Sequence, residues 1–187
     1  ESWNVSDSYA GVIEDSDIVI ITVPTPIDAN DGPNLEFIQS AASQVFRYIP
    51  NSREIFVILE STVFPGVTRE IFGKMCNNVG NNVVLAYCPE RVSPGDANNT
   101  VSTVSRVLGC DDEDHGEMLA LLYSEITSGG CRYVGKIEVA EAAKLIENVQ
   151  RDIDIAFVNE LSLILPKIGV DVEDVLNAAS SKWNFHR

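Results

Sequence analysis

Residues 135–165 read GKIEVAEAAKLIENVQRDIDIAFVNELSLIL, and neither Pro nor Gly interrupts them after Gly135. Apolar residues recur in this segment at three- and four-residue steps, which is typical of one buried helical face. They are Val139, Ala142, Ala143, Ile146, Val149, Ile153, Ala156 and Phe157. The pattern therefore predicts one long helix with a buried apolar face. Only part of that length can pack on the strands that precede it, so the remainder is expected to leave an apolar patch, with Ile153 and Phe157, through which the chain self-associates.

A second stripe of the same segment is polar and consists of Glu141, Lys144, Asn148, Arg151, Asp152 and Asn159. Lys144 and Asn148 are four residues apart, so their side chains leave the helix on one side, one turn apart. An ammonium and an amide both donate hydrogen bonds to oxygen, and together they can stabilise an oxyanion or position a substrate hydroxyl. A solvated helix face is the alternative, and it is the commoner reason for such a pair. The number of Asn and Asp residues, which are poor helix formers, argues for function.

Before this helix, five short apolar runs alternate with segments of helical periodicity. The runs are 18–23, 55–59, 83–87, 106–109 and 131–134, and the helical segments are 34–48, 67–76 and 111–123. The run at 18–23, IVIITV, is rich in β-branched residues and predicts a fully buried parallel strand. A last helix is expected at 171–179 with Asp171 as its N-cap. This order predicts an α/β sheet followed by an all-helical element.

Three of the predicted strands end in polar, turn-rich loops, namely Pro24-Thr25-Pro26, Glu60-Ser61-Thr62 and Cys88-Pro89-Glu90-Arg91. In an open parallel sheet, ligands bind beyond the carboxyl ends of the strands. One such loop is unremarkable by itself, but three in one sheet predict a cofactor or substrate crevice. The sequence contains no GxGxxG, so a phosphate-binding half of a dinucleotide site would lie upstream of Glu1. The ends, ESWNVSDSYA without Met and KWNFHR, suggest part of a longer chain.

Composition excludes several classes of protein. The net charge of -15 over 187 residues argues against binding to nucleic acid, which needs a basic surface. The four Cys form no CxxC and there are two His, so we predict no metal site and reduced thiols of a cytoplasmic protein. We find no signal peptide and no apolar run of membrane-spanning length, and we therefore predict no membrane association.

Five segments, taken in order, carry a resemblance to a known family. They are IVIITVPTP (18–26), ILESTVFPGVTRE (58–70), YCPERVSPGD (87–96), EVAEAAKLIENVQRDIDIAFVNELSLI (138–164) and SKWNF (181–185). Together they resemble the UDP-glucose/GDP-mannose dehydrogenase family, and the segments ENVQRD, NEL and KWNF look most like the branch that oxidises UDP-N-acetylhexosamines. The resemblance covers nearly the whole chain with compatible spacing.

The resemblance implies the fold and the domains. Residues 1–134 would be the second half of a Rossmann-like parallel sheet that binds NAD. Residues 135–187 would begin a central all-helical dimerisation domain, so a homodimer through the long helix is expected. Enzymes of the family oxidise the C6 alcohol of a nucleotide sugar to a carboxylate, using two NAD and a covalent intermediate on a Cys.

The resemblance also implies site residues. Pro24, Thr25 and Thr62 would lie by the nicotinamide side of NAD. Glu90 would face the sugar near the reacting carbon, while Lys144 and Asn148 would bind the oxygen at C6. Thr62, Glu90, Lys144 and Asn148 are thus the expected catalytic set.

Two departures from the family pattern matter. The glucose-specific branch has a second Glu four residues after the position of Glu90, where this chain has Pro94, which fits the N-acetylhexosamine branch. The family nucleophile lies downstream of KWNF, and none of the four Cys matches it. Cys88 is nearest to the expected site, and we interpret it as a small residue at a strand end.

The resemblance therefore implies an NAD-dependent UDP-N-acetylhexosamine 6-dehydrogenase that makes a uronic acid for polysaccharide synthesis. UDP-glucose is the alternative substrate. For this chain alone, a non-catalytic dimerising fragment is the alternative function. A β-hydroxyacid dehydrogenase also carries Lys and Asn on a helix after a Rossmann domain, but the PTP, EST and KWNF segments argue against it.

Overall fold

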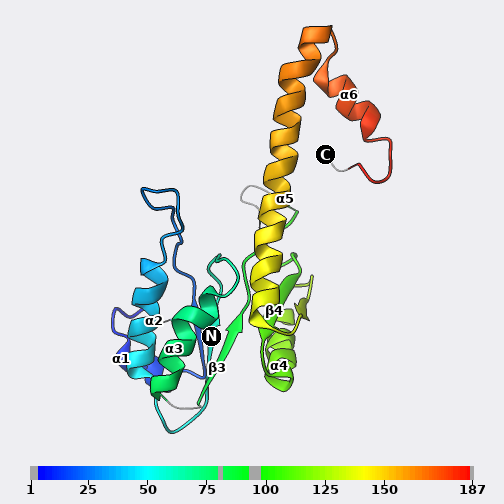
Figure 1. The fold of residues 1–187 in the computed structure, drawn as a ribbon. Helices are drawn as coiled ribbons and strands as arrows, with labels where there is room; N and C mark the ends of the chain where they lie inside the picture. Colours follow the sequence, from blue (N-terminus) through cyan, green and yellow to red (C-terminus); the bar gives the residue numbers. More distant parts are fainter. Residues whose placement is uncertain (1–3, 80–81, 93–97, 186–187) are drawn as a thin grey trace. The chain divides into compact units, whose positions relative to one another are not determined.

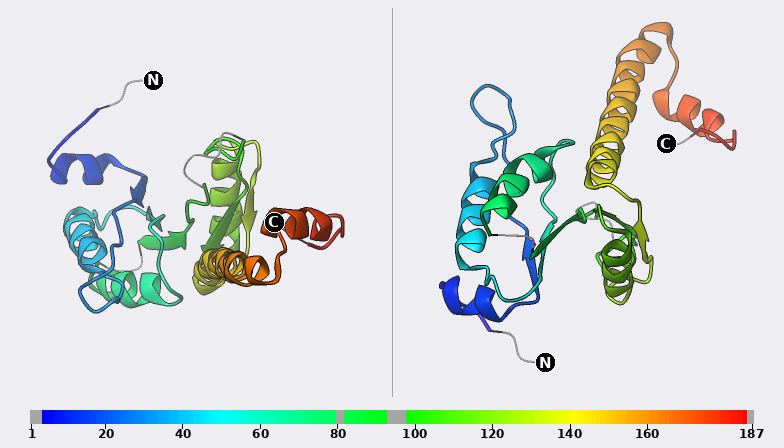
Figure 2. Two further views of the ribbon diagram at one scale, coloured as in Figure 1. Left: turned by 90° about the horizontal axis from the view of Figure 1, so that it is seen from above. Right: turned by 60° about the horizontal axis from the view of Figure 1, so that its bottom comes forward.

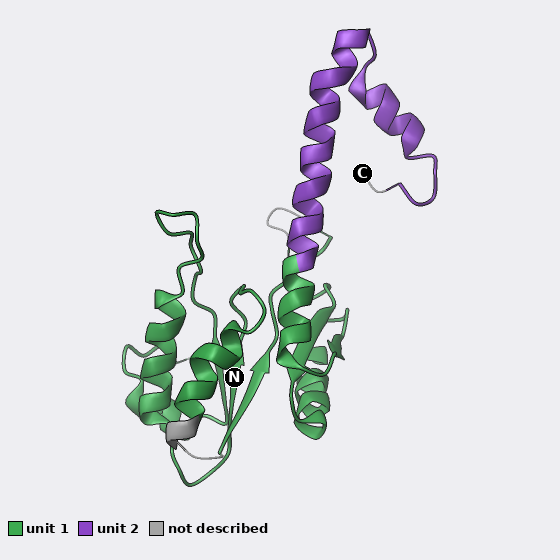
Figure 3. Cartoon of the chain, in the orientation of Figure 1, with its two compact units in different colours: residues 1–145 green, residues 146–187 purple. Residues whose placement is uncertain are grey.

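The computed structural model describes residues 4–79, 82–92 and 98–185, so the position of Pro94 lies outside the described residues. The chain divides into two compact units, residues 1–145 and residues 146–187 (Figure 3). Among the described residues, we find no helix that is both long and apolar enough to cross a membrane.

Helices and strands alternate along the first unit except at β3 and β4, between which the described residues form no helix (Figure 1). The order is α1 (Ala10–Asp15), β1 (Ile18–Ile21), α2 (Glu36–Tyr48), β2 (Ile55–Leu59), α3 (Val67–Val79), β3 (Val83–Tyr87), β4 (Arg106–Cys110), α4 (Glu113–Ser124) and β5 (Cys131–Tyr133). Helix α5 (Ile137–Ile164) starts in this unit and continues into the second, where η1 (Leu165–Ile168) and α6 (Val172–Ala179) follow. Each predicted strand and helix is present, within a few residues of its predicted bounds.

The strands form one sheet in the order β1-β2-β3-β4-β5. The pairs β1–β2, β2–β3 and β4–β5 are parallel, as predicted. The pair β3–β4 is antiparallel, with Ala86 opposite Cys110, which the sequence analysis did not predict. Parallel neighbours need a crossover connection that is usually a helix, and the described residues between β3 and β4 form none.

Both faces of the sheet are covered, which explains the continuous apolar runs. Val57 and Leu59 of β2 pack with α2, α3 and the start of α5 in one core cluster. Ile58 points to the other face and packs with Leu119 and Tyr123 of α4 in a second cluster. Figure 2 shows α2 beside α3, and α4 against β4 and β5.

The prediction that the first strand is fully buried is wrong. Ile20 of β1 is 47% exposed, and β1 pairs with β2 alone in the described sheet. Its neighbours Val19 and Ile21, which point to the opposite face, are buried. In the sheet that the described residues form, the strand therefore lies at an edge, and a run of β-branched residues does not distinguish an edge from a central strand.

The long helix is confirmed. Its apolar face is buried only in the first turns and exposed beyond them, which confirms the expectation that only part of the face packs on the sheet. The residues of α5 that are buried are Ile137, Ala140 and Glu141, all in its first turns. The larger apolar residues of the predicted face are 47% to 63% exposed, and they are Val139, Ile146, Val149, Ile153 and Phe157. Periodicity reveals an apolar face, but it does not reveal what covers that face.

The second unit is a helical hairpin. Gly169 ends η1 with a positive φ of 76°, a left-handed conformation that favours glycine. The side chain of Asp171 accepts hydrogen bonds from the N–H groups of Glu173 and Asp174, which confirms it as the N-cap of α6. Leu176 of α6 is buried, and it lines a cavity of about 510 Å³ together with Phe157 of α5.

Candidate functional site

The loops after β1 and β2 lie side by side at the carboxyl edge of the sheet. The Thr25 hydroxyl donates a hydrogen bond to the carbonyl of Thr62 over 3.0 Å. The Ser61 hydroxyl, which is buried, donates to the carbonyl of Val23 over 2.6 Å. The PTP and EST loops therefore contact each other, because β1 and β2 are parallel neighbours.

These two loops present both polar and rigid residues at the carboxyl edge of the sheet. Thr25 uses its hydroxyl to hold the backbone of Thr62, while the side chain of Thr62 is exposed at the sheet edge. Pro24 is exposed beside them and has no N–H that would need a partner. The arrangement gives a rigid backbone with one hydroxyl available to a ligand.

The third loop follows β3 and is tied to β2 by the N–H of Cys88, which donates to the carbonyl of Leu59 over 3.0 Å. Glu90 is half-buried, and its two carboxylate oxygens accept from the N–H of Val92 at 2.6 and 3.0 Å. The carboxylate is therefore held by its own loop. All three loops extend from parallel neighbouring strands at one edge, as predicted.

The four cysteines are free thiols, and Cys88 is completely buried. A hydrogen bond to Cys131, together with burial, raises the pKa of Cys88 well above its usual range. The same hydrogen bond lowers the pKa of Cys131. A buried thiol with a raised pKa is a poor nucleophile, which agrees with our interpretation of Cys88 as a packed residue.

The sequence did not predict an ion pair between Arg106 and Glu60, the first residue of the EST loop. Glu60 accepts a hydrogen bond from the hydroxyl of Tyr123 over 2.7 Å and pairs with Arg106 over 3.1 Å. The Arg106 guanidinium lies 5.3 Å from the centre of the Tyr123 ring, and its side chain is 8% exposed. Burial lowers the pKa of Arg106, but the interactions with Glu60 and Cys88 together outweigh this and raise it. No spacing in the sequence links these residues.

Breaking this pair is expected to destabilise the protein strongly. Replacing Arg106 with Met should cost about 3–5 kcal/mol, because it leaves the carboxylate of Glu60 buried without a counter-charge. Urea denaturation of the protein would measure the loss. Adding Glu60→Gln should recover part of it, because the second change removes the stranded charge.

The matched control is Lys74→Met. Lys74 pairs with Glu70 over 3.6 Å on the surface of α3, and both side chains are largely exposed. Such surface pairs contribute roughly 0–1 kcal/mol. Equal losses from Arg106→Met and Lys74→Met would contradict a buried, stabilising pair.

Lys144 and Asn148 lie one turn apart on the unbroken helix α5, as predicted. Lys144 belongs to the first unit and is half-buried, whereas Asn148 belongs to the second. The amide oxygen of Asn148 accepts from Arg151 over 3.2 Å, so the NH₂ group is the part that would donate to a substrate oxygen. Both positions are on the same side of the helix by their spacing of four residues.

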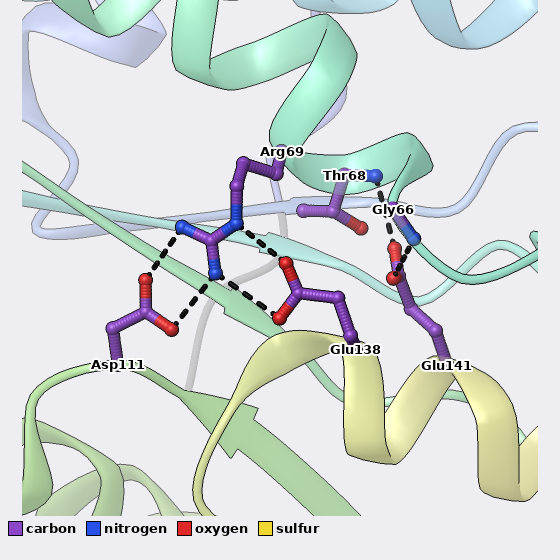
Figure 4. Close-up of polar contacts among 6 residues, drawn as sticks. All are labelled: Gly66, Thr68, Arg69, Asp111, Glu138 and Glu141. Atoms are coloured by element: carbon purple, nitrogen blue, oxygen red, sulfur yellow. Dashed lines mark hydrogen bonds and ion pairs between the residues drawn. The ribbon is translucent and has the colours of Figure 1, made fainter.

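The start of α5 is fastened to α3 by two carboxylates (Figure 4). Glu138 accepts from Arg69, whose other N–H groups donate to Asp111 at 2.7 and 2.9 Å. Glu141 accepts from the backbone N–H groups of Gly66 and Thr68 at 2.6 and 2.9 Å. The hydrogen bonds from Arg69 to Asp111 and Glu138 raise the pKa of the guanidinium.

A close backbone approach supports this attachment. A Cβ at Gly109 of β4 would lie 2.7 Å from the Cα of Ile137, so only glycine allows α5 to start this near the sheet. Glu141 appeared in the sequence only as one member of a polar stripe, yet it is completely buried. The sequence did hold one indication that a distant acceptor was needed. Pro65 and Gly66 precede α3, and neither offers a side chain that could cap that helix.

Comparisons with known proteins give matches over most of the chain. Residues 1–127 match the NAD binding domain of the UDP-glucose/GDP-mannose dehydrogenase family, and residues 138–187 match the central domain of the same family. The chain is 38% identical to Protein CapL of Staphylococcus aureus, over 97% of this chain and 44% of that protein. It is 39% identical to a UDP-N-acetyl-D-glucosamine 6-dehydrogenase of Pseudomonas aeruginosa, over 92% of this chain and 42% of that protein.

Among solved structures, the chain is similar to UDP-D-ManNAc dehydrogenase from Pyrococcus horikoshii. The TM-score is 0.86 at 29% identity, over 96% of this chain and 43% of that one. The chain thus spans less than half the length of the curated relatives that it matches. The two domain matches cover most of the chain, and the resemblance seen in the sequence is confirmed. By this evidence, the chain belongs to the UDP-glucose/GDP-mannose dehydrogenase family, whose members are enzymes with an NAD binding domain.

Proposed function

We propose that the whole protein oxidises the C6 alcohol of a UDP-N-acetylhexosamine to a carboxylate with NAD. The observation that carries the proposal is the 39% identity, over 92% of this chain, to a UDP-N-acetyl-D-glucosamine 6-dehydrogenase. Within this function, residues 1–134 are the second half of the NAD-binding domain and residues 135–187 begin the central domain. The uronic acid product would serve polysaccharide synthesis, and we place the reaction in the cytoplasm.

The loops after β1 and β2 would hold the nicotinamide half of the cofactor. Thr62 offers an exposed hydroxyl, Thr25 fixes the backbone beneath it, and Pro24 supplies a rigid surface. Bound NAD would accept the hydride from C6. The chain's own contribution here is orientation, which is worth most when the bound groups are held rigidly.

The oxygen at C6 would be bound by α5. Lys144 supplies a positive charge and Asn148 a neutral donor, and together they stabilise the negative charge that develops on that oxygen. Glu90 would face the sugar near the reacting carbon, where its half-buried carboxylate can order a hydroxyl or a water. None of the four cysteines is assigned as the covalent nucleophile.

The test is a steady-state assay of the full-length protein with NAD. We expect NADH to form with UDP-N-acetylglucosamine or UDP-N-acetylmannosamine, and about twice as much NADH as sugar consumed if a carboxylate is the product. UDP-glucose is assayed alongside. A preference for UDP-glucose would select the alternative substrate, and absence of NADH with all three sugars would contradict the proposal.

A homodimer through α5 is the second part of the proposal. Ile146, Val149, Ile153 and Phe157 follow one another at three- and four-residue steps and are all exposed. Soluble monomers seldom expose a continuous apolar face of this kind. Two-fold homodimers are the commonest soluble oligomers, and a second copy of the same face is its simplest cover.

Replacing Ile153 with Glu is expected to shift the protein from dimer to monomer, because it places a charge in the centre of that face. Sedimentation equilibrium measures the dissociation constant, which should rise by at least about tenfold, equivalent to roughly 1.4 kcal/mol. The control is Ser162→Glu. Ser162 lies on the opposite side of α5 from Ile153, so this change should leave the dissociation constant unchanged. A monomeric unmodified protein at tens of micromolar would leave the dimer without support.

A further inference from the structure

Glu141 is a buried carboxylate that the roles assigned above do not use. It is 0% exposed, and its two oxygens accept from two backbone N–H groups, those of Gly66 and Thr68 (Figure 4). A charged group is rarely buried unless hydrogen bonds satisfy it, and here both oxygens are satisfied. The cost of burying the charge makes the arrangement sensitive to any change in either partner.

The contact supplies a cap that α3 lacks. The first N–H groups of a helix have no partner within the helix, and a side chain just before the helix usually accepts from them. The residues before α3 are Pro65 and Gly66, which offer no such side chain. Helix α3 is thus capped by Glu141, which lies 73 positions beyond Thr68 on helix α5. The negative charge of Glu141 is at the N-terminus of α3, where the helix dipole favours it.

The contact also joins the two parts of the proposed site. Thr62 precedes the start of α3 by five residues, and Thr25 already fixes its carbonyl. Lys144 follows Glu141 by three residues on α5, so the two lie on the same side of that helix. A displacement between α3 and α5 at Glu141 would therefore move the hydroxyl of Thr62 relative to the ammonium of Lys144.

We propose that Glu141 is a positioning residue, which sets Lys144 and the EST loop in the mutual geometry that the reaction needs. The proposal rests on the function proposed above. A purely structural role is the alternative, and it predicts a different result. The ion pair between Arg69 and Glu138 also fastens α3 to α5, at a surface position, so the fold keeps one attachment when Glu141 is changed.

The experiment uses the full-length enzyme, with UDP-N-acetylglucosamine and NAD as the substrates. Glu141→Gln keeps the size of the side chain but leaves one oxygen to face two N–H groups. We expect kcat to fall by about tenfold or more, with a smaller change in KM for the sugar, because a misplacement near 1 Å costs up to about 10²-fold. The matched control is Glu70→Gln, an exposed carboxylate on α3 that should leave kcat within about twofold.

A second variant, Gly66→Ala, changes the other partner of the same contact, just before α3. Gly66 has a φ of 98°, and a Cβ added there would have no heavy atom within 4 Å, so Gly66→Ala strains the backbone without a clash. We expect it to lower kcat as well. If both changes act through one contact, the double variant is no slower than Glu141→Gln alone. This variant decides the question if Glu141→Gln does not fold.

Hydrogen exchange gives a readout besides activity. In Glu141→Gln, exchange should quicken in residues 60–68 and stay unchanged in α2. Circular dichroism supplies the folded fraction by which kcat is corrected. A corrected kcat equal to that of Glu70→Gln, or additive effects in the double variant, would overturn the proposal. An unmodified enzyme that makes no NADH would instead refute the proposed function, whatever the exchange data show.

Discussion

Replacing Lys144 with Ala in the full-length enzyme is expected to lower turnover by about 10²-fold or more, the size found when one oxyanion donor is lost. The ammonium is the one full positive charge in the proposed pair with Asn148. Its loss leaves the negative charge that develops on the C6 oxygen to a neutral amide. The measurement is kcat with saturating UDP-N-acetylglucosamine and NAD.

Stability should change much less in the same variant. Ala is the best helix former, and position 144 lies within the unbroken helix α5. At this half-buried position we expect a loss in the free energy of unfolding of no more than about 1 kcal/mol, the usual size for a point substitution. The control is Lys167→Ala, an exposed Lys in η1, which should leave both quantities unchanged. Equal turnover in Lys144→Ala and the unmodified enzyme would show that Lys144 is only a solvated residue.

The 187-residue chain alone is expected to form no NADH from any of the three UDP-sugars, with a rate several orders of magnitude below that of the full-length enzyme. Two physical reasons support this. The sequence contains no GxGxxG, so it lacks the loop and helix N-terminus that bind a pyrophosphate. None of its four cysteines is assigned as the nucleophile, and losing a covalent nucleophile costs up to about 10⁶-fold in turnover.

The assay compares equal concentrations of the chain and the full-length enzyme. Circular dichroism of the chain is the control, since an unfolded sample would be inactive for a trivial reason. A folded chain with no NADH fits the expectation. Steady turnover by the chain would show that residues 1–187 already hold the complete reaction machinery, and it would overturn the assignment of the nucleophile to another segment.

The sequence by itself was sufficient for the elements, the class and the family. Each predicted strand and helix is local in origin, because hydrophobic periodicity and turn residues act over a few positions. The polar loops at Thr25, Thr62 and Glu90 followed from the same reasoning, since the ends of parallel strands meet at one edge. The pair Lys144 and Asn148 needed only the helical repeat.

Two features of the fold depended on what surrounds each element. The antiparallel pairing of β3 and β4 depends on the path of the connection between them, which no periodicity describes. The exposed face of α5 has the same pattern as a buried face. A repeat of apolar residues shows that a helix has an apolar face, but it does not show which element packs against that face. Ile153 was predicted on the apolar face and is found at the surface.

Only the tertiary structure decided the roles of Glu60 and Glu141. Glu141 is separated from its partner Gly66 by 75 residues, and Glu60 from Tyr123 by 63. The chemistry of a carboxylate is the same in both places, but its environment is set by the residues that folding brings around it. A Glu in a polar helical stripe is ordinarily solvated, and Glu141 is buried because the N–H groups at the start of α3 have no closer acceptor.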